Sequence, residues 1–178
     1  MKILAFAGSN SEVSINKKLV TFASEFFNEH DVEILDLNDY EMPIYKHERE
    51  VENGVPQLAK DFAEKIDGSD LILMSLAEHN WAYSTAFKNV FDWVSRIKGR
   101  THFGDKPIFL MATSTGNGGG KNVVEVFTKR APVSGAEIIT SFTLPKFNDN
   151  FEEGKGITDE EKLAELKEKI QTVKTHIS

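Results

Sequence analysis

A loop of small polar residues near the start of the chain has the composition of an anion-binding site. It covers residues 8–16 and reads Gly-Ser-Asn-Ser-Glu-Val-Ser-Ile-Asn. An apolar run typical of a strand, residues 2–7, precedes it, and a segment with helical periodicity, residues 17–27, follows it. A strand that turns into a helix in this way directs free backbone N–H groups and hydroxyls at one point, next to the positive end of the helix dipole. We interpret the loop as the phosphate-binding loop of a mononucleotide site.

The residues of this loop are candidate ligands for a phosphate monoester. We predict phosphate contacts from the hydroxyls of Ser9, Ser11 and Ser14 and from the amide of Asn16, and we include Ile15 among the cofactor-binding residues. The loop contains neither the Gly-Lys-Ser/Thr of a Walker motif nor the Gly-x-Gly-x-x-Gly of a dinucleotide site, so its donors are neutral. Serine and asparagine are also ordinary capping and turn residues, so the loop by itself leaves a purely structural role open.

The composition limits the possible chemistry. The 178 residues are 40% hydrophobic and carry a formal charge of −7, which suits one domain with a full core and argues against a nucleic-acid partner. The absence of cysteine excludes disulfides and thiolate catalysis, and the scattered histidines have no metal-ligand spacing. No apolar segment approaches the ~20 residues that span a bilayer, and the N-terminal run is too short for a signal peptide. We therefore expect a soluble, cytoplasmic protein with no membrane partner and no metal site.

Apolar runs alternate with helical periodicities along the chain. Strands are predicted over residues 2–7, 31–37, 69–75, 106–112 and 136–142, and helices over residues 14–28, 55–66, 84–97, 122–131 and 159–175. Residues 38–53 are predicted to be a long connection without firm structure, and a further loop leads to the final helix. The alternation favours a doubly wound α/β sheet, in which ligands bind beyond the carboxyl ends of the strands, near the switch in strand order.

Two more loops at these carboxyl ends have unusual compositions. The loop after the third strand offers Ala77, Glu78, His79, Asn80 and Trp81, and the loop after the fourth offers Ser114, Thr115, Gly116, Asn117 and Gly118. Glycines let the backbone approach a flat ligand closely, so one loop for a phosphate and two for a planar ring fit flavin mononucleotide. A tight turn is the alternative for the glycines, and packing at a helix entrance or an oligomer interface is the alternative for Trp81 and Tyr83. His79 lies either near the flavin edge or toward solvent.

Three segments together resemble the NAD(P)H-dependent FMN reductases of the flavodoxin-like fold, over nearly the whole chain. The first segment, Gly8-Ser9 with Ser14 and Asn16, resembles the phosphate loop of the family. The second, Glu78-x-Asn80 followed by Phe87-Lys88-Asn89-Val-Phe-Asp92-Trp93, resembles its Pro-Glu-Tyr-Asn loop and its Leu-Lys-Asn-x-x-Asp-Trp helix. The third, Ser114 with Gly116, Gly118 and Gly119, resembles its glycine-rich loop under the isoalloxazine. Three positions depart from the family pattern. Ser11 stands where an arginine is frequent, Ala77 where proline is usual and His79 where tyrosine is usual.

The resemblance implies one flavodoxin-like FMN-binding domain over residues 1–178. Its five parallel strands would lie in the order 2-1-3-4-5, with helices on both faces. It implies FMN as cofactor and NAD(P)H as co-substrate, with hydride passed through the flavin to a quinone, flavin, azo or metal-type acceptor. The helix over residues 84–97 would belong to a subunit interface of a homodimer or homotetramer. No catalytic side chain is predicted, because the cofactor carries the chemistry.

Two functions of other classes remain compatible with the sequence. One is an FMN-bearing electron carrier with a protein partner, which suits the acidic balance but lacks the Thr-x-Thr-Gly-x-Thr pattern of flavodoxins. The other is a flavodoxin-like binding module that has lost FMN, which the missing arginine at Ser11 keeps open.

Overall fold

A computed structural model of the chain describes all residues from 1 to 178. Its centre is a five-stranded parallel sheet in the order β2-β1-β3-β6-β7. The strands are β1 (Lys2–Gly8), β2 (Asp31–Leu35), β3 (Leu71–Leu76), β6 (Lys106–Thr113) and β7 (Ala136–Leu144). Counted along the chain, these five strands have the order 2-1-3-4-5, which confirms the predicted flavodoxin-like arrangement. The strand order switches between β1 and β3.

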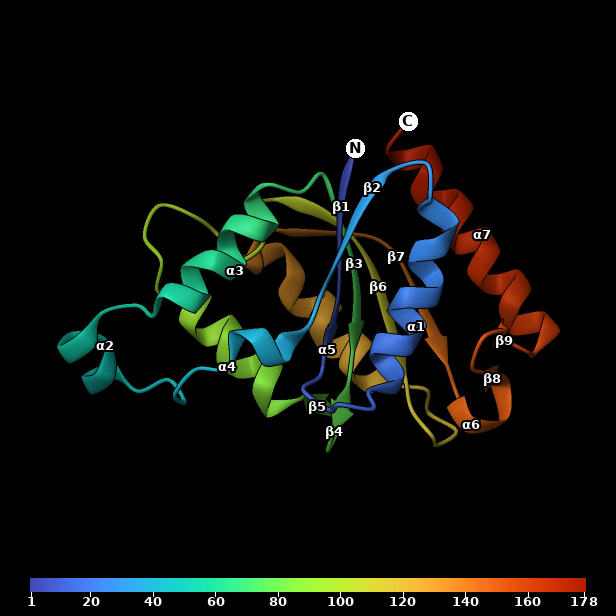
Figure 1. The fold of residues 1–178 in the computed structure, drawn as a ribbon, viewed down its shortest axis with the longest axis horizontal. Coiled ribbons are helices and arrows are strands. Elements are labelled where there is room, and N and C mark those ends of the chain that lie inside the picture. The colour runs from blue at the N-terminus through green and yellow to red at the C-terminus, as the bar shows by residue number, and fades with distance from the viewer.

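Helices cover both faces of the sheet (Figure 1). On one face lie α1 (Ile15–Ser24) and α7 (Glu160–His176), and on the other lie α3 (Gln57–Asp67), α4 (Thr85–Val94) and α5 (Lys121–Arg130). Short 3₁₀ turns are η1 (Glu25–Phe27), η2 (Leu37–Tyr40) and η3 (Ala131–Ser134). The five long helices correspond to the five that periodicity predicts, with ends within a few residues.

The core has two halves because side chains alternate between the faces of each strand. Leu4 and Phe6 of β1 point to the α3 side, where the Phe6 ring meets Phe62 edge-on at 5.3 Å between ring centroids. Ile3 and Ala5 point to the other side and pack in one cluster with α1 and α7. Strands covered on both faces explain the continuous apolar runs in the sequence.

The prediction of no firm structure over residues 38–53 was wrong. Part of η2 and all of α2 (His47–Asn53) fall in this range. The first turn of α2 is acidic, and the helix ends at Gly54, whose φ of 73° is in the left-handed region that glycine favours. None of its residues is buried, so the sequence carries no apolar stripe that would reveal it.

Two other predicted loops contain short hairpins. Residues 76–83 form β4 (Glu78–His79) and β5 (Ala82–Tyr83), and the segment before α7 contains α6 (Phe147–Asn150), β8 (Phe151–Glu152) and β9 (Gly156–Ile157). The turn of the first hairpin places Asn80 and Trp81 at φ values of 51° and 67°. Positive φ at both central residues is what a tight two-residue hairpin requires, and Asn-Gly supplies it more often than Asn-Trp.

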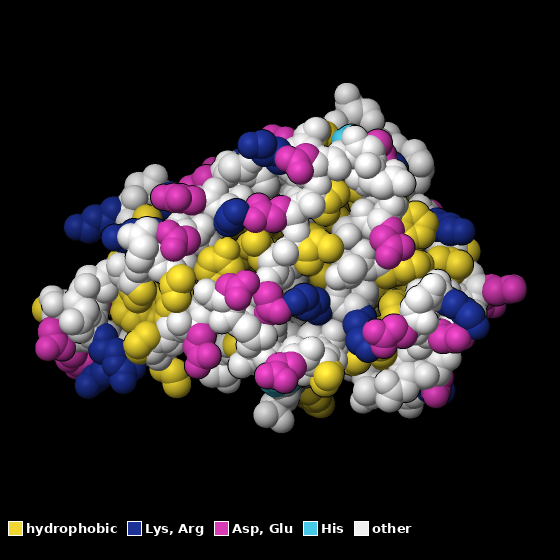
Figure 2. Space-filling model, viewed as in Figure 1, with side chains coloured by type: hydrophobic (Ala, Val, Ile, Leu, Met, Phe, Trp, Pro, Cys, Tyr) yellow, Lys and Arg dark blue, Asp and Glu magenta, His cyan; other side chains and the backbone are white.

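The surface mixes charges of both signs. Figure 2 shows acidic and basic side chains scattered over the face in view, with apolar side chains between them in several groups from one end of the face to the other. None of the helices combines the length and the apolar character that a bilayer crossing requires.

His102, in the connection between α4 and β6, is the histidine with the clearest electrostatic effect. Its ring stacks on Phe91, with 4.1 Å between ring centroids and an interplanar angle of 19°. Burial against this ring lowers the pKa of His102 below its ordinary value, and the nearby Arg130 and Arg100 act in the same direction.

We predict that His102 makes the protein less stable as the pH falls below about 6.5. The unfolded chain then binds a proton that the folded chain still resists, so protonation favours unfolding. The variant His102→Phe keeps the aromatic stack and removes the titrating group. Between about pH 7.5 and about pH 5, its unfolding free energy should therefore fall less than that of the natural chain. Urea unfolding of both proteins across this range measures the difference. Parallel pH profiles for the two proteins would contradict the prediction.

Candidate functional site

The three loops that follow β1, β3 and β6 meet at one edge of the sheet, the lower edge in Figure 1. A cavity of about 300 Å³ lies between them, at the predicted position next to the switch in strand order. Its lining consists of Ser9, Ser11, Val13, Ser14, Ile15, Asn16, Ala77, Glu78, His79, Thr113, Ser114 and Thr115. Five residues predicted for the site lie outside this lining, namely Asn80, Trp81, Gly116, Asn117 and Gly118. Val13 and Thr113 were not predicted, although each is adjacent in sequence to residues that were.

The first loop ends in a capped helix. The Ser14 hydroxyl accepts a hydrogen bond from the backbone N–H of Lys17 at 3.1 Å, as an N-cap does. Its own proton stays available for donation, and the N–H groups of Ile15 and Asn16 have no partner within the helix because they lie in its first turn. Ser14 therefore caps the helix, as the structural alternative from the sequence had it, and the loop still has hydrogen-bond donors that are free to bind a ligand.

The Asn16 side chain is buried and forms its hydrogen bonds with other residues of the protein. It is 3% exposed. Its Oδ1 accepts hydrogen bonds from the Ser75 hydroxyl at 2.8 Å and the Thr113 N–H at 3.0 Å, and its Nδ2 donates to the Thr113 carbonyl at 3.2 Å. The amide thus ties the first loop to the ends of β3 and β6. This role depends on strand positions, so sequence reasoning gave no signal of it.

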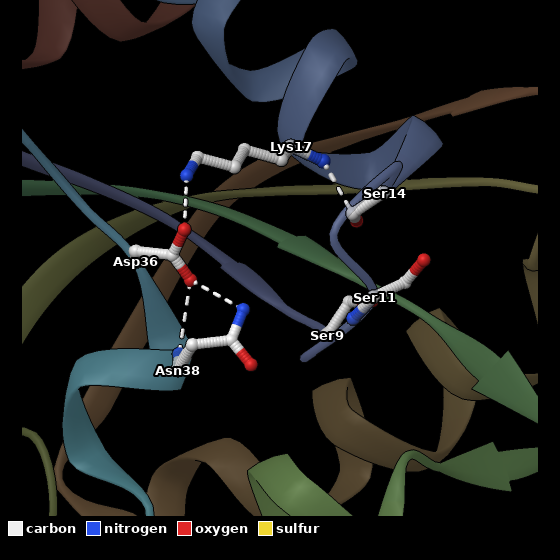
Figure 3. Close-up of polar contacts among 6 residues, drawn as sticks. All are labelled: Ser9, Ser11, Ser14, Lys17, Asp36 and Asn38. Carbon is white, nitrogen blue, oxygen red and sulfur yellow. Dashed lines mark hydrogen bonds and ion pairs between the residues drawn. The ribbon is translucent and has the colours of Figure 1, made fainter.

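No lysine or arginine lines the cavity. The closest cation along the loop is Lys17, and Figure 3 shows its ammonium group turned toward Asp36 and away from Ser9 and Ser11. Asp36 also accepts hydrogen bonds from the backbone N–H and the side-chain amide of Asn38, both at 2.9 Å. The hydrogen bond from Lys17, with that from the Asn38 backbone, lowers the pKa of Asp36 below its usual value.

The second loop is fastened to the helix of the third loop. The Glu78 carboxylate accepts hydrogen bonds from the Asn122 side chain and the Val123 N–H, both at 3.0 Å. Asn122 and Val123 belong to the first turn of α5, where a negative charge is favoured by the helix dipole. Glu78 therefore holds the hairpin against the glycine-rich segment.

The two aromatic residues of the second loop differ in their surroundings. Tyr83 packs edge-on against Phe87 and Phe127, with ring centroids 5.6 and 6.2 Å away, so the packing alternative holds for it. Trp81 is 75% exposed at the tip of the hairpin. His79 is exposed as well, in agreement with the solvent-facing alternative, although its side chain also borders the cavity.

The glycines of the third loop fall into two groups. Gly119 and Gly120 are buried and have φ values of 61° and 83°. A Cβ on Gly120 would lie 2.6 Å from the Cβ of Ala112, so these two glycines serve the turn and its packing. Gly116 and Gly118 are exposed, with nothing closer than 4.0 Å to an added Cβ. Only this second group leaves open space for a ligand.

Comparison with known proteins identifies the family. Residues 1–149 match the family described as NADPH-dependent FMN reductase. The chain belongs to this family. It is 28% identical over 173 residues to the NADH:(hydroxy)cinnamate reductase subunit CrdA of Vibrio ruber, covering 94% of this chain and 83% of that protein. It is 29% identical over 126 residues to an NADPH:quinone oxidoreductase of Arabidopsis thaliana, covering 68% and 62% of the two chains.

Solved structures of flavoenzymes share the fold. The flavoenzyme FerB of Paracoccus denitrificans, an NAD(P)H:(acceptor) oxidoreductase, superposes with a TM-score of 0.74 at 20% identity, covering 98% of each chain. At this identity the likeness establishes the flavodoxin-like architecture.

The two groups of glycines predict different responses to substitution. Gly120→Ala should lower the unfolding free energy by about 1–3 kcal/mol, because the new methyl group meets Ala112 and the backbone is left-handed. Gly118→Ala should change it by less than about 0.5 kcal/mol. Chemical denaturation of both variants tests this, and equal losses would show that the glycines are not divided in this way.

Proposed function

We propose that the protein is an FMN-dependent oxidoreductase that passes hydride from NAD(P)H through bound flavin to a small-molecule acceptor. The acceptor classes are quinones, flavins, azo compounds and metal ions or oxyanions. The observation that carries the proposal is the cavity at which the loops after β1, β3 and β6 meet, in a chain of the NADPH-dependent FMN reductase family. We also propose that the working form is a homodimer or homotetramer.

The residues around the cavity fit a flavin mononucleotide in the chemistry of their donors. The phosphate would lie at the first loop, where the hydroxyls of Ser9, Ser11 and Ser14 adjoin the free N–H groups at the start of α1. The isoalloxazine would lie between the second and third loops, with contacts from residues 77–81 and 114–118. The exposed Gly116 and Gly118 leave room for a ring to approach the backbone there.

The role of the protein in this reaction is to bind and to orient. When bound, FMN would supply the hydride chemistry, so no acid–base side chain is needed at the reacting atoms. Backbone N–H groups of the second and third loops would favour negative charge on the ring by hydrogen bonding. The hydrogen bonds of Asn16 and Glu78 would hold the three loops at fixed positions, which limits the reorganisation that binding requires.

A second candidate is a flavodoxin-like binding module without FMN. The observation that favours it is the absence of lysine and arginine from the cavity lining, together with the pairing of Lys17 with Asp36. A phosphate bound there would rely on neutral donors alone.

The proposal predicts that the protein binds FMN much more tightly than riboflavin, which lacks the phosphate. Titration of the purified protein followed by flavin fluorescence measures both affinities. The variant Ser11→Arg should lower the Kd for FMN about tenfold through a charge-assisted hydrogen bond, and leave that for riboflavin unchanged. Ser11→Gln is the matched control, since it adds length without charge at the same exposed position.

Two results would oppose this proposal. Absence of saturable FMN binding would exclude the reductase and favour the FMN-free module. Equal affinities for FMN and riboflavin, unaltered in Ser11→Arg, would show that the first loop does not hold the phosphate. If FMN binds, oxidation of NADH or NADPH by the loaded protein separates the reductase from an electron carrier.

A further inference from the structure

A second cavity, the α1 cavity, lies between α1 and the hairpin of β8 and β9. Its volume is about 410 Å³, within the range of small-molecule sites. Residues of α1 and of the loop before it form one wall, and Phe151 with residues 153–156 forms the other. Both walls lie on the α7 side of the sheet, opposite α4 (Figure 1). The α1 cavity is therefore separate from the helix proposed for the subunit interface.

One wall of the α1 cavity lies beyond the part of the chain that matches the family. The match covers residues 1–149, which include α1 and its loop, whereas the hairpin follows it. The cavity is thus formed by a family element together with a segment outside the match. Its ligand has to be inferred from the residues of this chain.

The floor of the α1 cavity is aromatic and held in place by packing. The rings of Phe22 and Phe151 meet edge-on, with 5.9 Å between ring centroids. Gly156 is buried at a φ of 85°, and a Cβ there would lie 2.0 Å from the Phe22 ring, so only glycine lets the hairpin pack this closely. Both rings stay partly exposed. A flat base can stack on such rings, because every base has an aromatic face.

The α1 cavity has the cations that the cavity proposed for FMN lacks. Its lining includes Lys18 and Lys155, and a third lysine, Lys17, which is turned toward Asp36. The Lys18 ammonium group lies 2.9 Å from the carboxylate of Glu153, whose side chain is 83% exposed. Water screens an exposed pair of this kind, so exchanging the carboxylate for a phosphate costs little.

The other polar groups of the lining can bind a sugar. They are the carboxylates of Glu12 and Glu25 and the hydroxyl of Thr21. Carboxylates accept hydrogen bonds from ribose hydroxyls, and they repel simple anions. Together with the aromatic floor and Lys18, this set favours a molecule that combines a flat base, a sugar and phosphates.

The α1 cavity and the cavity proposed for FMN share Val13 and Ser14 in their linings. We infer that the α1 cavity binds the adenosine diphosphate part of NAD(P)H, from which the nicotinamide ring can extend past the shared wall toward the flavin. The inference rests on the proposed function, which makes NAD(P)H the co-substrate. Lys18, whose backbone N–H donates to the Ser14 carbonyl at 3.1 Å, stands one helical turn from this wall and would bind the pyrophosphate.

The test is the binding of ADP-ribose, which lacks the nicotinamide ring, to the full chain with and without saturating FMN. Isothermal titration gives its Kd without any redox reaction. The variant Thr21→Tyr places a ring in the α1 cavity and should raise this Kd about tenfold or more, while the Kd for FMN stays within about twofold. Thr128→Tyr, on the exposed side of α5, makes the same change away from the cavity and should leave both constants unaltered.

Two charge variants test the phosphate contact without relying on the folding of Thr21→Tyr, since both side chains reach solvent. Lys18→Gln removes the cation and should raise the Kd for ADP-ribose about fivefold. Glu153→Gln releases Lys18 from its partner and should lower the same Kd about threefold. Adenosine is the matched neutral ligand, and its Kd should change by less than about twofold in both variants.

The outcomes separate this inference from the proposed function. Equal ADP-ribose affinities of the natural chain and Thr21→Tyr, or displacement of ADP-ribose by FMN, would overturn the assignment even if FMN is bound. Failure of ADP-ribose to bind a chain that binds FMN and oxidises NAD(P)H would do the same and leave the reductase standing. ADP-ribose binding that Thr21→Tyr weakens in a chain that binds no FMN would support the α1 cavity as a nucleotide site and reject the reductase.

Discussion

The buried amide of Asn16 is the interaction on which the geometry of this edge depends. The side chain connects the start of α1 to Ser75 near the end of β3 and to Thr113 at the end of β6. Removing it would leave the Thr113 N–H and C=O unpaired in a buried place, at a cost of about 1–3 kcal/mol for each group. The first loop is therefore fastened to the sheet through a buried side chain.

The second and third loops are joined in the same manner, by Glu78 at the start of α5. The helix cap and the loop contact are one interaction, so the position of the hairpin follows that of the helix. Tyr83 adds an apolar contact on the inner side of the hairpin, while Trp81 on its tip stays exposed. Loops fastened in this way have little freedom to lose, which would favour the proposed binding by neutral donors without a fixed positive charge.

The features that produce a local periodic pattern of apolar residues could be predicted from the sequence. The five strands of the sheet and the five long helices follow from apolar patterns, and the three loops follow from their positions at the strand ends. The features that the sequence did not predict have no such pattern. The helix α2 buries nothing, and the Asn80-Trp81 turn lacks the glycine that signals a tight hairpin. The division between Gly118 and Gly120 depends on the distance to Ala112, a residue of another element, so no local rule could reveal it.

The pair of Lys17 and Asp36 joins the start of α1 to the segment after β2. As an ion pair it contributes little, because its side chains are 39% and 33% exposed and water screens them. Its importance is geometric, since Asp36 also accepts the N–H of Asn38 and so begins η2, in which Leu37 and Tyr40 are buried. Lys17 meanwhile follows the Ser14 cap at the start of α1, beside the first cavity. The pair therefore holds the segment after β2 against the start of α1, next to the cavity proposed for FMN.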